Sequence, residues 1–117
     1  MVCCISATFA NIERMKKINR KTALHYAAEI NSTVIAELLL SQGANVNEKA
    51  KYGETTLHYA AEINSTVIAE LLLSQGANVN EKAKYGETTL HYAAEINSTV
   101  IAELLLSQGA NVNEKDQ

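Results

Sequence analysis

The sequence predicts an all-α solenoid of stacked helix-turn-helix units that repeat every 33 residues. The first observation is the octapeptide TTLHYAAE, present at residues 55–62 and 88–95, with the variant TALHYAAE at residues 22–29. The second is that three 26-letter segments are identical, namely Leu24–Lys49, Leu57–Lys82 and Leu90–Lys115. The third is helix length: segments of about three turns or fewer are marginal alone. Stacking one copy on the next buries their apolar sides and makes them stable.

The first helix of each unit is predicted from the TTLHYAAEI segment. In the middle copy, Thr55 is suited to cap the helix, because its hydroxyl can accept a hydrogen bond from a free backbone N–H. Leu57, Ala60 and Ala61 then lie three and four residues apart on one apolar face. Asn64 tolerates the left-handed conformation, so we expect the helix to stop there.

The second helix is predicted from the TVIAELLLSQ segment that follows. Ser65 can cap it, and Ile68, Leu71 and Leu72 form its apolar stripe. Gly76 comes directly after and is a typical helix stop. The next segment, GANVNEKAKYGE, is polar and rich in Gly and Asn, which predicts a turn-rich connector.

Composition excludes several classes of function. A length of 117 residues suits one domain, and a net charge of −3 is too mild to indicate nucleic-acid binding. No apolar run reaches the roughly 18 residues that span a bilayer, so no membrane partner is expected. Cys3 and Cys4 are adjacent and match no zinc or redox spacing. With no disulfide framework, we expect an intracellular, cytoplasmic setting.

The domain organisation is predicted to be one continuous array. Residues 1–21 are expected to form an N-terminal partial repeat, a capping helix followed by a basic loop, since Val2, Ile5, Phe9 and Ile12 have helical spacing. Residues 22–117 then form three repeats, at about 22–50, 51–83 and 84–117. The basic loop residues favour a solvated loop over nucleic-acid binding or nuclear targeting; they are Arg14, Lys16, Lys17, Arg20 and Lys21.

The segments TLHYAA and ELLLSQGANVN, together with the 33-residue period, resemble ankyrin repeats over residues 22–116. The family motif T-P-L-H-x-A-A reads Thr-Thr-Leu-His-Tyr-Ala-Ala here. The resemblance implies paired antiparallel helices with projecting β-turn fingers, and protein binding as the function. The sequence departs from the family at Thr56 and Thr89, where proline is usual, at Ala50 and Ala83, where aspartate is usual, and at Asn64, where glycine is usual.

The repeated histidine is assigned a structural role by the same resemblance. It implies that the ring hydrogen-bonds with the motif threonine and with backbone of the adjacent unit; the pairs are Thr22 with His25, Thr55 with His58, and Thr88 with His91. A catalytic base would need a nucleophile or substrate within reach, and the sequence offers no such partner. His58 and Glu62 are four residues apart but lack a third metal ligand. We therefore expect no enzyme activity, no cofactor and no metal.

The resemblance also implies where a protein partner of unknown identity binds, namely on the fingers and the exposed side of the first helix. Those positions are Lys51, Tyr52, Glu54, Glu62 and Ile63, with Lys84, Tyr85, Glu87, Glu95 and Ile96 in the next copy. The identity of these residues between the two copies indicates either recent duplication or a designed, consensus-like array. In the second case the main activity is folding and self-association. Asn47, Asn80 and Asn113 are candidate hydroxylation sites, although a turn-stabilising role is favoured.

Up to Lys115, the last repeat has the same sequence as the internal copy before it, with no polar substitutions that would cap the array. We therefore expect it to expose apolar side chains for contact with another copy, and Ile101, Leu104 and Leu105 are the candidates. Head-to-tail contact would give a dimer or a filament. Two apolar ladders are a second candidate surface for self-association: Ile30, Ile63 and Ile96, with Val34, Val67 and Val100.

Overall fold

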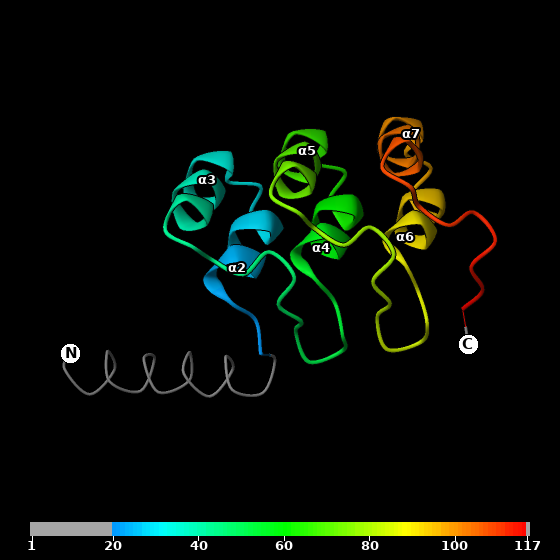
Figure 1. The fold of residues 1–117 in the computed structure, drawn as a ribbon, viewed down its shortest axis with the longest axis horizontal. Coiled ribbons are helices and arrows are strands. Elements are labelled where there is room, and N and C mark those ends of the chain that lie inside the picture. The colour runs from blue at the N-terminus through cyan, green and yellow to red at the C-terminus, as the bar shows by residue number, and fades with distance from the viewer. Residues whose placement is uncertain (1–19, 117) are drawn as a thin grey trace, which may run out of the picture.

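The computed structural model describes residues 20–116 and contains six α-helices in three pairs, with no strand in that range (Figure 1). The helices are α2 (Ala23–Glu29), α3 (Thr33–Ser41), α4 (Thr56–Glu62), α5 (Thr66–Ser74), α6 (Thr89–Glu95) and α7 (Thr99–Ser107). The predicted all-α solenoid of helix-turn-helix units is confirmed. The predicted capping helix and most of the basic loop lie outside the described residues.

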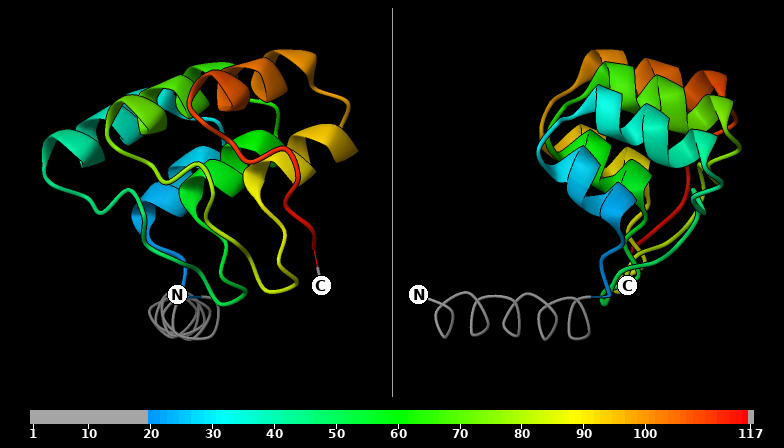
Figure 2. Two further views of the ribbon diagram at one scale, coloured as in Figure 1. Left: turned by 45° about the vertical axis from the view of Figure 1, so that its right-hand side comes forward. Right: turned by 90° about the vertical axis from the view of Figure 1, so that its left-hand side faces the viewer.

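The helix pairs stack in two rows (Figures 1 and 2). Helices α2, α4 and α6 form the first row, and α3, α5 and α7 form the second. Each helix contacts its partner in the pair and its counterpart in each neighbouring pair. The connectors between pairs project beyond the first row as hairpin-like fingers. In the text below, the first, second and third units are the pairs α2–α3, α4–α5 and α6–α7.

The helices begin and end where the sequence predicts. Thr22, Thr55 and Thr88 are the N-caps of the first helices, and Ser32, Ser65 and Ser98 cap the second helices. In the middle unit, the Ser65 hydroxyl accepts a hydrogen bond from the Ile68 backbone N–H at 3.4 Å. Asn64 has a φ of 59°, so a left-handed asparagine separates α4 from α5.

The core lies between the two rows and between consecutive units. Leu57, Ala60 and Ala61 of α4 are fully buried, as are Ile68 and Leu72 of α5. Burying each of the large aliphatic side chains contributes roughly 1.5–3 kcal/mol to folding. The two alanines have almost no side-chain volume, and the neighbouring first-row helices therefore approach closely.

Each finger is a tight hairpin loop. The Ala50 N–H donates to the Glu54 carbonyl at 2.8 Å, and the Gly53 N–H donates to the Ala50 carbonyl at 3.0 Å. Gly53 has a φ of 75°, and a Cβ added there would lie 3.3 Å from the Ala83 Cα atom in the next finger. The Lys84 N–H donates to the Tyr52 carbonyl at 2.7 Å. The finger before α4 and the finger before α6 therefore pack and hydrogen-bond against each other.

None of the helices between residues 20 and 116 is both long enough and apolar enough to cross a lipid bilayer.

Candidate protein-binding surface

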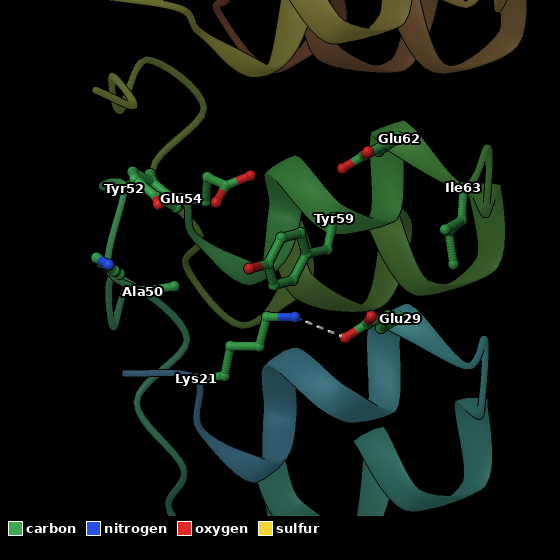
Figure 3. Close-up of a pocket in the computed structure, with 9 residues that line it drawn as sticks. Lys21, Glu29, Ala50, Tyr52, Glu54, Tyr59, Glu62 and Ile63 are labelled. Carbon is green, nitrogen blue, oxygen red and sulfur yellow. Dashed lines mark hydrogen bonds and ion pairs between the residues drawn. The ribbon is translucent and has the colours of Figure 1, made fainter. Parts of the chain in front are cut away.

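A groove runs between the fingers and the first-row helices, and two cavities open along it. The first pocket has a volume of about 590 Å³ and lies between the first and second units (Figure 3). Its lining comprises Lys21, Glu29, Ala50, Lys51, Tyr52, Glu54, Tyr59, Glu62 and Ile63. The five binding residues predicted in the middle copy thus lie together, although they come from a finger and from the end of α4.

The second pocket lies one unit further along, with a volume of about 440 Å³. Its lining comprises Glu54, Glu62, Glu87, Tyr92, Glu95 and Ile96. Of the five residues predicted in the third copy, Glu87, Glu95 and Ile96 are therefore part of this pocket. Lys84 and Tyr85 are on the finger outside its lining. The Lys84 ammonium lies 5.1 Å from the centre of the Tyr52 ring, and the Tyr85 side chain is 60% exposed.

Two tyrosines that the sequence interpretation did not assign to binding also line the groove. Tyr59 lines the first pocket and Tyr92 the second. Each ring packs edge-on against the histidine of the preceding unit, at 5.3 Å between the His25 and Tyr59 ring centres and 5.0 Å between those of His58 and Tyr92. Each tyrosine directly follows the motif histidine in sequence, but only the stacking of units reveals that its ring reaches the groove.

The groove is predominantly acidic. Burial raises the pKa of the Glu54 carboxyl above its ordinary value, and the negative charge of Glu62 raises it further. Burial also raises the pKa of the Tyr59 and Tyr92 hydroxyls, and the neighbouring Glu54 carboxylate adds to the effect in both cases. Burial is the larger cause of all three shifts, and the negative charge gathered around these groups adds to it.

Each of the three histidines accepts a hydrogen bond from the N-cap of its own helix, and this bond defines the tautomer. The His58 Nδ1 atom accepts from the Thr55 backbone N–H at 3.1 Å. Its Nε2 atom lies 3.2 Å from the Glu87 carbonyl oxygen, which can only accept, so Nε2 carries the proton. Burial lowers the pKa of His58 to about 4 and keeps the ring neutral.

His25 repeats this arrangement, with Nε2 3.0 Å from the Glu54 carbonyl. Within residues 20–116, His91 makes only the bonds to the N-cap of its own helix, where Nδ1 accepts from the Thr88 N–H at 3.0 Å. The pairing of each histidine with its motif threonine is thus present in all three units. With both nitrogens hydrogen-bonded, His25 and His58 are not available as general bases.

Within residues 20–116, no cluster of three or more His, Cys, Asp or Glu side chains is arranged to hold a metal ion.

A ladder of asparagines joins the units on the side of the connectors. The Asn47 side chain donates to the Gly76 carbonyl at 3.3 Å and accepts from the Asn78 N–H at 2.8 Å. Asn80 makes the same two bonds one unit later, at 3.2 Å to Gly109 and 2.8 Å from Asn111. These asparagines therefore bridge neighbouring units rather than only stabilising their own turns.

The predicted position of the terminal apolar surface is corrected by the structure. Ile101 and Leu105 are fully buried, and Leu104 is partly buried, because this side of α7 faces α5 and α6. The last unit instead exposes Val112 by 66% and Leu106 by 44%, whereas the equivalent Val79 is buried and Leu73 is partly buried. In the two apolar ladders, Ile30, Val34, Val67, Ile96 and Val100 are exposed and Ile63 is partly buried.

Comparison with known proteins identifies the fold family. A family model described as "Ankyrin repeats (3 copies)" matches residues 2–83 and again residues 51–116. A search of curated proteins found no matching sequence. Repeats of this kind are in general non-enzymatic modules that bind other proteins. The matched segments cover nearly the whole sequence, and the chain belongs to the ankyrin-repeat family.

Proposed function

We propose that the chain is a non-enzymatic scaffold that binds a protein partner in the groove between its fingers and its first-row helices. The observation that carries this proposal is the first pocket, where five residues expected to contact a partner line one cavity (Figure 3). They come from two segments that the fold alone brings together. We place this activity in the cytoplasm, given the adjacent cysteines and the absence of a disulfide framework in the sequence.

The chemistry of the groove suits protein recognition. Tyr52 and Tyr85 are 47% and 60% exposed at successive fingers. Tyrosine is enriched at protein interfaces, because its ring buries a large apolar area while its hydroxyl still hydrogen-bonds. Lys51, Glu62 and Ile63 add a cation, an anion and an apolar contact within the same pocket.

The proposal is tested by affinity capture from an extract of the source organism. The immobilised full chain is compared with the double variant Tyr52→Ala/Tyr85→Ala and with the control Val67→Ala/Val100→Ala, which changes exposed residues outside the groove. We expect proteins retained by the wild type and the control to be lost by the tyrosine variant. Equal capture by all three proteins would contradict the proposed groove.

Self-association of the array is the second candidate function, and one observation favours it. Val112 is 66% exposed, whereas the equivalent Val79 is 8% exposed beneath the next unit. The outer side of the third unit thus presents apolar surface that the next unit covers inside the array. Light scattering coupled to size exclusion tests this candidate. A fraction of dimer that rises with protein concentration, and that Val112→Asp abolishes, would support it. A monomer of 12.7 kDa at every concentration would reject it.

A further inference from the structure

The first unit shows how this groove holds a lysine side chain. The Lys21 ammonium lies 5.4 Å from the centres of both the Tyr26 and the Tyr59 rings. It also pairs with a Glu29 carboxylate oxygen at 3.1 Å (Figure 3). A cation within about 6 Å of a tyrosine ring is attracted by the negative face of its π system. The seat for this lysine is therefore made of two ring faces from consecutive units and one carboxylate.

The sequence positions of this seat recur one unit later without a lysine, and two of them, Tyr92 and Glu62, line the second pocket. Tyr59, Tyr92 and Glu62 stand one period after Tyr26, Tyr59 and Glu29, but the residue one period after Lys21 is Glu54. The Tyr92 hydroxyl lies 3.5 Å from a Glu54 carboxylate oxygen. An acidic side chain thus stands where the repeat pattern holds a cation in the unit before.

The second pocket consequently carries concentrated negative charge. Four of its six lining residues are glutamates, one is Tyr92 and one is Ile96. No lysine, arginine or histidine is among them, whereas the first pocket includes both Lys21 and Lys51. Burial raises the pKa of Glu54 and the negative charge of Glu62 raises it further, so a positive charge brought between the two carboxylates relieves their repulsion.

From this correspondence between the Lys21 site and the second pocket, we infer that the second pocket binds the ammonium group of a lysine in a basic segment of the partner protein. This inference rests on the proposed function and names the chemistry of the partner. The glutamates supply the counter-charge, the Tyr92 ring supplies a π face, and Ile96 contacts the aliphatic stem of the incoming side chain.

Two other sources of positive charge fit the pocket less well. The glutamates are not arranged as metal ligands, since residues 20–116 contain no group of three or more such side chains that would hold an ion. The neighbouring lysines of the chain are already engaged. Lys84 lies over the Tyr52 and Tyr85 rings, Lys49 pairs with Glu81, and Lys82 pairs with Glu114.

The decisive experiment measures binding of a fluorescein-labelled peptide with lysine at every third position, in which serine and glycine fill the other positions. Anisotropy is followed with the full chain at low salt. The groove variant Glu62→Gln/Glu95→Gln and the control Glu70→Gln/Glu103→Gln remove the same charge from the second and third units. The control residues are exposed on α5 and α7, outside the lining of either pocket. We expect the groove variant to weaken the affinity roughly fivefold and the control to stay within about twofold. Equal weakening would show that only net charge matters and would overturn the inference.

A second pair of variants tests the lysine seat itself. Lys21→Met empties the first seat, so the peptide gains a second site and its affinity rises. Lys115→Met makes the same change in net charge on a residue outside either pocket lining and should raise the affinity less. An equal rise for both variants would contradict the assignment of Lys21 as an internal occupant.

The remaining outcomes separate this inference from the function on which it rests. Failure of the peptide to bind at any concentration up to about millimolar would overturn the lysine assignment, while capture that depends on Tyr52 and Tyr85 would still support the scaffold. If the groove variant alone abolishes self-association of the unliganded chain, the occupant is a second copy and the assignment to a partner protein is wrong.

Discussion

The Nε2 atom of His58 donates a hydrogen bond to the carbonyl oxygen of Glu87, 3.2 Å away and 29 residues later in the chain. His25 and Glu54 make the same bond one unit earlier at 3.0 Å. Each bond ties a first-row helix to the base of the next finger. The finger residues that line the groove are therefore held by a histidine in the preceding unit.

Replacing His58 by alanine should lower the free energy of unfolding by about 1–3 kcal/mol, because it leaves the Thr55 N–H and the Glu87 carbonyl without their partner. His91→Ala is the matched control, since its local sequence is identical. The His91 Nε2 atom has no acceptor within residues 20–116, so this variant should cost about 1 kcal/mol less. Denaturant unfolding measures both values. Equal losses would show that the bond between units contributes nothing.

Acidification should destabilise the fold between about pH 6.5 and pH 4. The pKa of His58 falls to about 4 in the native state because the ring is buried, while the unfolded chain keeps a value near 6.5. In this window the unfolded state binds a proton that the native state excludes, so stability falls as the pH falls. The loss for this group is on the order of 3 kcal/mol and is complete below the native pKa.

His25, whose pKa burial also lowers, acts in the same direction. Glu54 acts in the opposite direction, because burial raises its pKa and the native state then binds the additional proton. The contribution of His58 is isolated as the difference between the wild type and His58→Ala, measured by unfolding at pH 7, 5.5 and 4. A difference that does not shrink with acidification would contradict the assigned pKa shift.

Thr56→Val should raise the free energy of unfolding by about 0.5–1.5 kcal/mol. The Thr56 hydroxyl is buried and has no hydrogen-bond partner within the described residues, so the isosteric valine removes a polar group that folding leaves unsatisfied. Thr66 occupies the same first helical position in α5 but is only partly buried. Thr66→Val therefore serves as the control, with little change expected. A loss of stability on Thr56→Val would mean that the hydroxyl is bonded in solution.

Asn80→Ala should cost about 1 kcal/mol, whereas Asn113→Ala should cost a few tenths at most. Both asparagines end an ANVN segment, but only Asn80 bonds the following unit, through the Gly109 carbonyl and the Asn111 N–H. Thermal unfolding of the two variants gives the comparison. Identical melting temperatures would argue that these exposed bonds are replaced by water without loss.

The repeat period and the helix caps were predictable because the local sequence determines them. Thr55 and Ser65 cap their helices, and Asn64 takes the left-handed conformation that the sequence predicted. Each of these features depends on interactions within a few residues. The binding residues of the middle copy were implied by the family resemblance, and the first pocket contains all five.

Features that depend on which neighbouring repeat covers a unit were not predictable from the sequence. Ile101 was expected on the outer side of the last unit, yet it is fully buried, while Val112 is exposed in its place. Which side of a helix is covered is decided by the direction of stacking, and identical repeats carry no record of that direction. Tyr92 was missed for the same reason, since its ring reaches the groove only after the units are stacked.

Photo-crosslinking from two exposed positions tests most directly the claim that partners bind in the groove. Benzoylphenylalanine is placed at Tyr52, which lines the first pocket and is 47% exposed, or at Val100, which is 59% exposed at the start of α7. With a captured partner present, the account predicts crosslinked heterodimer from position 52 and none from position 100. Crosslinking from position 100 alone would contradict it and would move the binding surface to the apolar ladder on the second-row helices.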